Sequence, residues 1–231
     1  MGVWWFGPSC PVAPREQMWI DDSMGWFESE FGEPRAIVLP AHFAGLTSAQ
    51  EVFAKVADCL GIDPGGVDLE LYGERPLQHD RARGHSAAGH YRTRKGRPVI
   101  AIETGQPLKS LVSTVAHELG HVLLLGDGRV SHTRRDHEPL TDLLTVHFGL
   151  GIFSANAAFE FSSRQSGWSW ERLGYLTEPM YGYALARYTW RLGEPKPGWA
   201  EHLDLNPRTC LRQGLRYFRN QTSASAKNAL T

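Results

Sequence analysis

The chain has 231 residues, of which 42% are hydrophobic and 21% are charged, and its formal net charge is −1. This composition excludes an extensively disordered chain and disfavours a general polyanion-binding protein, because the sequence has neither a low apolar content nor an excess of basic residues. The length is enough for one sizeable hydrophobic core, or for one core with a helical extension.

The sequence has no apolar run near the roughly 20 residues that cross a membrane. Its first residues, Met1 to Phe6, lack the basic start and the long apolar stretch of a signal peptide. The cysteines are odd in number and far apart, which favours reduced thiols at Cys10, Cys59 and Cys210. We therefore expect a cytoplasmic protein without a membrane segment.

The front of the chain predicts a mixture of helices and short strands. Apolar positions recur at helical spacing over residues 14–31 and 48–60, and a short strand is expected between these helices at residues 35–39. Residues 67–72 alternate apolar and acidic side chains, which is typical of a half-buried strand. The polar residues 74–88 are expected to form a loop.

A β-hairpin is expected next, because residues 89–94 and 98–103 flank Lys95-Gly96. If residues 99–103 lie at the sheet edge, their free backbone groups offer a pairing site for an extended peptide. An ordinary core strand is the equally weighted alternative. A solvated hairpin tip is favoured over an anion-binding role for the nearby basic residues Arg92, Arg94, Lys95 and Arg97.

Residues 117–121 read His117-Glu118-Leu119-Gly120-His121, an HExxH motif inside a helix expected over about 108–125. Four residues turn an α-helix through about 400°, so the two imidazoles point from one face, one turn apart, and can share a metal ion. Glu118 lies about 100° further round, where a base acting on a zinc-activated water is needed. The motif therefore indicates zinc-assisted hydrolysis.

Two histidines leave zinc short of a third protein ligand. A second helix follows, which contains Glu138-Pro139-Leu140-Thr141-Asp142. HExxH followed by ExxxD on a second helix resembles the gluzincin class of zinc metallopeptidases, and the resemblance covers roughly residues 97–150. It implies that His117, His121 and Glu138 hold zinc, and that Asp142 supports a ligand histidine.

The residues themselves leave the third ligand open. Glu138 precedes Pro139, and a residue before proline is biased away from helical geometry, so Glu138 is expected at the very start of the second helix. Asp142 lies inside that helix and is the alternative ligand, with His132 and His137 as minor competitors. Acidic residues are also common at helix N-termini without a metal. The upstream HExxH nevertheless favours Glu138.

The back half of the chain predicts further helices. His147, in the second helix, is expected to be a core histidine rather than a site residue. Residues 163–178 have a loop-like composition. Zinc hydrolysis also needs an oxyanion donor, and the candidates, among which the sequence does not choose, are Tyr175, Tyr181 and Tyr183.

A last helix is expected over residues 207–218, followed by a disordered tail at 221–231. An arginine face is expected on this helix, and a solvated surface is favoured over nucleic-acid contact. The arginines are Arg208, Arg212, Arg216 and Arg219.

The sequence thus predicts an α+β, zincin-like fold with a small mixed sheet, an HExxH helix and a helical C-terminal half. We expect one domain over residues 1–220, with an α/β front part at about 14–125 and a helical part at about 136–220. The predicted function is zinc-dependent hydrolysis of a peptide or protein substrate, with Glu118 as general base and Zn²⁺ as cofactor. The alternatives are a zincin-like regulatory or binding protein with structural zinc, and a protease that acts on nucleoprotein.

Overall fold

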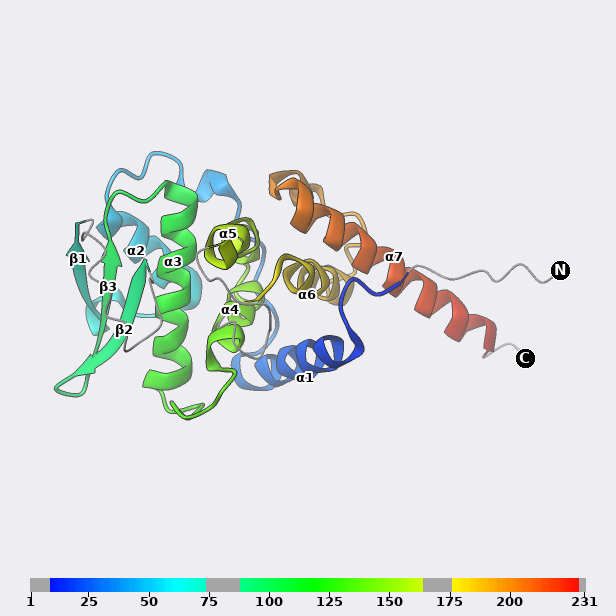
Figure 1. The fold of residues 1–231 in the computed structure, drawn as a ribbon, viewed down its shortest axis with the longest axis horizontal. Helices are drawn as coiled ribbons and strands as arrows, with labels where there is room; N and C mark the ends of the chain where they lie inside the picture. Colours follow the sequence, from blue (N-terminus) through cyan, green and yellow to red (C-terminus); the bar gives the residue numbers. More distant parts are fainter. Residues whose placement is uncertain (1–8, 74–87, 164–175, 229–231) are drawn as a thin grey trace.

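The computed structural model describes residues 9–73, 88–163 and 176–228, which form a mixed α+β fold that is mostly helical (Figure 1). The described residues contain seven α-helices, namely α1 Pro14–Phe31, α2 Ala49–Leu60, α3 Leu108–His121, α4 His137–His147, α5 Gly151–Ser163, α6 Glu178–Arg191 and α7 Leu205–Asn228. The described strands are β1 Asp68–Tyr72, β2 Gly89–Arg94 and β3 Arg97–Glu103. Short 3₁₀ segments lie at Pro40–Phe43, Pro64–Gly66 and Gly198–His202. The predicted α+β class, small mixed sheet and helical C-terminal half are confirmed.

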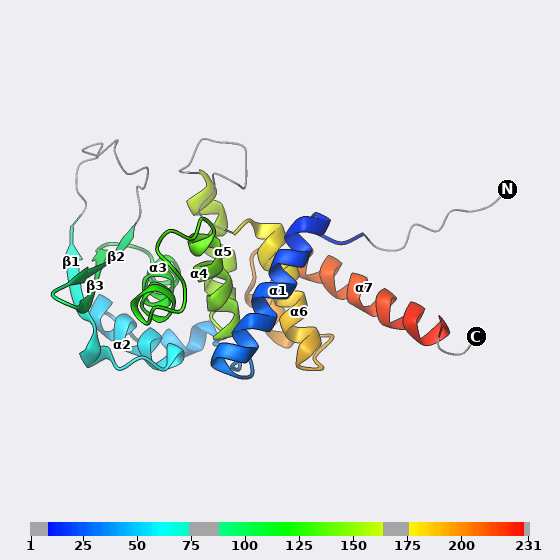
Figure 2. The same ribbon diagram turned by 90° about the horizontal axis from the view of Figure 1, so that it is seen from below.

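The elements follow one another along the long axis of the molecule (Figures 1 and 2). The sheet lies at one end, with α2 and α3 packed beside it, and α4 and α5 come next. At the other end lie α6, α1 and α7. One contiguous hydrophobic core takes residues from all seven helices. The HExxH helix α3 therefore lies between the sheet and the helical half.

The sheet has the strand order β1-β3-β2, in which β1 is parallel and β2 antiparallel to β3. The turn between β2 and β3 has positive φ at Lys95 (52°) and Gly96 (79°), as a two-residue hairpin turn requires. The predicted hairpin is therefore confirmed. β3 is paired on both sides, so residues 99–103 form an interior strand, which was the equally weighted alternative to an edge. The edge strand beside α3 is β2.

Local sequence signals account for α2. The Ser48 hydroxyl accepts a hydrogen bond from the Glu51 N–H at 3.2 Å, and the Glu51 carboxylate accepts one from the Ser48 N–H at 2.9 Å. At the other end, Gly61 adopts the left-handed conformation that closes a helix. These two signals set the helix boundaries within one residue of the prediction.

The strand predicted at residues 35–39 is absent, and this prediction is wrong. The segment is extended, but its backbone pairs with the end of α4, with Arg35 N–H donating to the His147 carbonyl at 2.9 Å and Val38 N–H to the Gly149 carbonyl at 2.8 Å. A Cβ atom on Gly149, whose φ is 79°, would lie 2.1 Å from the Ala36 oxygen. The segment therefore caps a helix instead of joining the sheet.

The helix ends also differ from the predictions in two places. α3 ends at His121, and one π-helical turn over Val122–Gly126 continues it. The last helix, α7, continues to Asn228, so the expected disordered tail is wrong for residues 221–228. This stretch has no glycine or proline that would stop a helix, and its Ala and Lys residues favour one.

Candidate metal centre

Three polar side chains of the HExxH motif are buried on α3. His117, Glu118 and His121 are 8%, 5% and 5% exposed. Burial of ionisable groups is costly unless other polar groups or a metal ion compensate. The contacts of these three side chains therefore decide what the site can bind.

The first turn of α4 brings a carboxylate to the two histidines. The Oε2 atom of Glu138 lies 2.9 Å from His117 Nε2 and 3.4 Å from His121 Nε2. The helix begins at His137, so Pro139 stands in the first turn, where its missing N–H breaks no helical hydrogen bond. Proline thus leaves Glu138 in place, and this ligand candidate meets both histidines.

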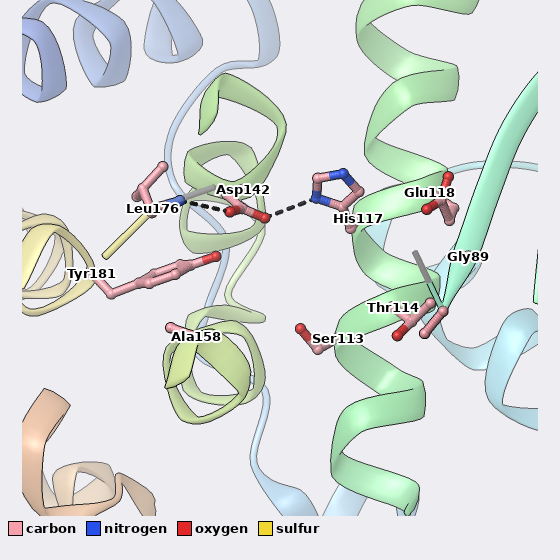
Figure 3. Close-up of a pocket in the computed structure, with 10 residues that line it drawn as sticks. Gly89, Ser113, Thr114, His117, Glu118, Asp142, Ala158, Leu176 and Tyr181 are labelled. Atoms are coloured by element: carbon pink, nitrogen blue, oxygen red, sulfur yellow. Dashed lines mark hydrogen bonds and ion pairs between the residues drawn. The ribbon is translucent and has the colours of Figure 1, made fainter. Parts of the chain in front are cut away.

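Asp142, one turn further along α4, does not join this group. Its Oδ1 atom lies 2.8 Å from His117 Nδ1, and its Oδ2 atom accepts a hydrogen bond from the Leu176 N–H at 2.9 Å (Figure 3). The carboxylate therefore holds the nitrogen of His117 that faces away from Glu138. A carboxylate in this position fixes the tautomer and orientation of a ligand histidine.

Thr141 has the corresponding contact with His121, which sequence analysis missed. The Thr141 hydroxyl donates to the His137 carbonyl at 2.7 Å and lies 3.2 Å from His121 Nδ1. A hydroxyl has one proton, so at His121 it accepts a hydrogen bond from the Nδ1–H. The Nε2 atom of His121 then carries the free lone pair and faces Glu138. A threonine three residues after a ligand carboxylate, on the same helix face, is the sequence signal for this role.

Gly120 allows Thr141 to come this close. A Cβ atom at Gly120 would lie 2.7 Å from Cγ2 of Thr141, too short for a van der Waals contact. The glycine inside the HExxH motif therefore lets α4 lie against the backbone of α3.

The pKa values of two carboxyl groups in the site, those of Glu118 and Glu138, are shifted in opposite directions. Burial raises the pKa of Glu118 to about 7, and repulsion from Glu138 and Asp142 adds to this effect while His117 opposes it. Burial also acts to raise the pKa of Glu138, but its hydrogen bond to His117 and the proximity of His121 outweigh burial and lower it. Glu138 is thus a carboxylate suited to bind a cation, whereas Glu118 can exchange a proton near neutral pH.

The pKa of His117 responds to the same neighbours. Burial acts to lower it, but the hydrogen bonds to Asp142 and Glu138 outweigh burial and raise it. Without a cation, a proton on His117 is the positive charge that balances the surrounding carboxylates. The site is therefore built to hold positive charge.

The donor set fits zinc. His117, His121 and Glu138 each offer one ligand atom, and these three atoms lie within 4.8 Å of one another. Ligands at about 2.1 Å from a tetrahedral zinc lie about 3.4 Å apart, which matches the 3.4 Å between His121 and Glu138. The distance of 2.9 Å between His117 Nε2 and Glu138 Oε2 would have to increase by about 0.5 Å for both atoms to bind the same zinc ion. Two nitrogens, one oxygen and a remaining open position are typical of catalytic zinc sites.

A cavity of about 200 Å³ adjoins this group. Its walls come from β2, α3, the π-helical turn and the start of α4, and the residues that line it are Gly89, His90, Tyr91, His117, Glu118, His121, Leu125, His132, His137 and Glu138. His132 and His137, the minor competitors for the third ligand, thus line the cavity without joining the group of three. Sequence analysis missed the β2 residues, because nothing local indicates which strand faces α3.

A second cavity, of about 20 Å³, adjoins His117 and Glu118 and extends toward α5 and α6 (Figure 3). Gly89 lies where β2 approaches α3, and a Cβ atom on it would lie 2.7 Å from both Glu118 and Thr114 side chains. Only glycine at this position lets the edge strand reach the general-base candidate.

The three tyrosines proposed as oxyanion donors lie in different surroundings. Tyr181 lines the smaller cavity, with its ring directed toward Asp142 (Figure 3). Tyr183 lines neither cavity, and its hydroxyl donates to the Asp21 carboxylate at 3.1 Å. Tyr175 lies outside the described residues.

The remaining candidates lie away from the metal centre. The hairpin arginines form ion pairs across the sheet, with Arg92 on Glu70 and Arg97 on Asp68. His147 is 1% exposed and packs against Phe27, which confirms it as a core histidine. Both groups are therefore structural.

Comparisons with known proteins found no relative of this chain. The chain matches no family model, no curated protein sequence and no solved structure. None of the described helices combines the length and the apolar character needed to cross a membrane. The geometry of the site is therefore the basis for any functional conclusion.

Proposed function

We propose that this protein is a zinc-dependent metallopeptidase with a zincin-like active site of the gluzincin type. The observation that carries the proposal is the buried His117, His121 and Glu138 group with Glu118 beside it in the same cavity. Bound zinc would supply Lewis acidity to a water molecule and to the substrate carbonyl. Peptides and proteins are the proposed substrates.

Glu118 would serve as general base. Its carboxylate accepts a proton from the attacking water and can deliver that proton to the leaving amine, so each peptide bond broken returns Glu118 to its starting state. Burial gives it a pKa of about 7, which suits a group that both takes and gives a proton. The positive charge of a bound cation would shift this pKa downward and keep Glu118 ionised at neutral pH.

The edge strand supports a peptide as the substrate. β2 is an edge strand of the described sheet, and its residues Gly89, His90 and Tyr91 line the cavity next to Glu118. An extended peptide that pairs with β2 would place its backbone next to the Glu118 carboxylate. The 200 Å³ cavity leaves room for a substrate segment there.

The proposal is tested with Glu118→Gln, measured by zinc content and by cleavage of a mixed peptide library. The amide keeps the size of the side chain but cannot accept the proton, so we expect one zinc per chain and a loss of cleavage of at least about 100-fold. Glu201→Gln is the matched control, because that side chain is 77% exposed and lies outside the cavity.

Two results would contradict the proposal. Undiminished cleavage by Glu118→Gln would show that another group is the base. Zinc that remains bound without cleavage of any peptide by the unmodified protein would favour the binding or regulatory alternative, with the metal in a structural role.

A further inference from the structure

The last helix carries a charge imbalance that the metal centre does not use. α7 contains four arginines, one lysine and no aspartate or glutamate. The residues outside α7 carry a formal net charge of −6, because the whole chain carries −1 and α7 carries +5. α7 therefore has a net positive charge, whereas the rest of the protein is net negative.

The four arginines share one face of α7. At 100° per residue they fall within an arc of about 80°, and at 1.5 Å per residue they span about 16 Å. Three of them are exposed, namely Arg212, Arg216 and Arg219, and Arg208 is half-buried. They form a continuous row, which we name the arginine row.

The adjacent face of α7 is occupied by α6. Leu211 and Leu215 are buried, and a Cβ atom on Gly214 would lie 2.6 Å from the Cβ atom of Ala186 on α6. Among the described side chains of α7, Leu205 is the exposed large hydrophobic one, so these side chains offer no continuous apolar face to a lipid surface. The arginine row is the part of the helix that is open to a partner.

Several other arginines of the protein form ion pairs that the arginine row lacks. Arg97 lies 2.6 Å from Asp68, Arg134 lies 2.6 Å from Asp136, and Arg187 lies 3.0 Å from Asp21. In the part of the chain that the structure describes, no arginine of the row has a carboxylate within ion-pair distance. Within residues 9–73, 88–163 and 176–228, the four guanidinium groups thus have no counter-charge.

The row also lies far from the metal centre along the molecule. In Figures 1 and 2, α7 lies at the end of the molecule opposite to the sheet, and α4, α5 and α6 lie between it and α3. A large partner on α7 would therefore leave the cavity beside Glu118 accessible.

We propose that α7 binds the phosphate backbone of double-stranded nucleic acid without reading its sequence. Duplex DNA carries one negative charge per about 1.7 Å of its axis, so a row of about 16 Å faces several phosphates. Guanidinium groups are well suited to phosphate oxygens, and Asn220 beside the row adds an amide group of the kind that contacts phosphates. This binding goes beyond the proposed peptidase function and does not require zinc.

The test is fluorescence anisotropy of a labelled 20-base-pair DNA duplex with the full chain, between 50 and 300 mM salt. Three to four phosphate contacts predict a slope of about −3 in a plot of log K against log salt. The variant R212Q/R216Q/R219Q is expected to lose at least about tenfold in affinity at 50 mM salt and most of the slope. R212K/R216K/R219K, which keeps the charges, should retain most of the binding.

The matched control is K95Q/K109Q/K196Q, which removes three exposed positive charges elsewhere. It should bind DNA like the unmodified chain, and circular dichroism should show all variants folded. The proposal fails if the unmodified chain does not bind the duplex at 50 mM salt, or if the three glutamines leave its affinity unchanged. Displacement of the duplex by an equal charge of polyglutamate would overturn the assignment to nucleic acid in favour of an acidic protein.

Discussion

Thr141 fixes the protonation of His121, one of the three proposed metal ligands. Its hydroxyl proton is committed to the His137 carbonyl, so the oxygen accepts from His121 and leaves His121 Nε2 unprotonated. Metal ligands must be deprotonated at the binding atom. Thr141 therefore prepares His121 for a cation before any cation arrives.

We predict that Thr141→Val lowers zinc affinity by about tenfold or more, whereas Thr141→Ser stays close to the unmodified protein. Valine has the same shape but no oxygen, so His121 loses the acceptor that fixes its tautomer. The measurement is competition for zinc with a chelating dye, which needs no substrate.

Thr145→Val is the matched control for that experiment. Thr145 is also buried on α4, but its hydroxyl bonds to the Asp142 carbonyl and to Ser154 instead of to a histidine. If Thr145→Val weakens zinc binding as much as Thr141→Val, the effect comes from a loosened α4 and not from His121.

The roles of Glu138 and Asp142 could be predicted from the sequence only in part. Both carboxylates lie on one helix face at a spacing of four, so the pattern indicates that both address the motif. Which one meets Nε2 and which meets Nδ1 of His117 depends on how α4 lies against α3, and that is set by contacts such as Gly120 with Thr141. No local signal contains this information.

At the scale of elements, local sequence signals determine where helices and turns begin and end, but they do not determine which strands lie side by side. The Ser48 cap, the Gly61 stop and the Lys95-Gly96 turn act within a few residues, and the helix and hairpin that they bound were predicted correctly. The order β1-β3-β2 depends on a parallel pairing between segments about 30 residues apart. The apolar run at residues 99–102 fits an edge strand and an interior strand equally well, so the sequence left both positions open.

The contact between residues 35–39 and the end of α4 can be tested at Gly149, which lies against Ala36. We expect Gly149→Ala to lower the free energy of unfolding by about 3 kcal/mol, because the added methyl group meets the Ala36 oxygen and the residue keeps a positive φ. Urea denaturation measures the loss.

The variant Gly193→Ala separates the cost of the positive φ from the cost of the contact with the Ala36 oxygen. Gly193 has a similar φ of 69°, but nothing lies within 4 Å of the position that an added methyl group would take, so only the backbone cost of about 1 kcal/mol is expected. Equal losses for the two variants would mean that the contact with the 35–39 segment contributes nothing.

At the scale of the whole molecule, His147 couples stability to pH. It is buried against Phe27 and Phe31 where α1 meets α4, and neither of its ring nitrogens has a hydrogen-bond partner in the described structure. Burial lowers its pKa to about 4, with the Arg35 charge acting in the same direction and Glu28 opposing it. The folded protein therefore keeps His147 neutral.

We predict that the protein loses up to about 2 kcal/mol of stability between pH 7 and pH 5 through this residue. The folded-state pKa is below the unfolded value of about 6.5, so the stabilisation is complete above pH 6.5 and disappears as the pH falls toward 4. Urea titrations at several pH values measure it. His147→Leu should flatten this dependence and His42→Gln should not, and an unchanged slope in His147→Leu would refute the assignment.

The distribution of charge is another property of the whole molecule that composition conceals. A net charge of −1 disfavours polyanion binding for the chain as a whole, yet it is the sum of an acidic body and a basic helix. The arginines of α7 were visible in the sequence. Their lack of partners among the described residues was not, because the sequence does not distinguish them from the hairpin arginines, which are all paired with Asp68 or Glu70.

A single turn of α4 holds both histidines of α3 through Glu138, Thr141 and Asp142. Sliding one helix past the other by one residue moves these side chains by about 1.5 Å, which is enough to break contacts of 2.8 to 3.2 Å simultaneously. The centre therefore has no half-assembled form. A change that repositions either helix therefore disturbs both histidines together.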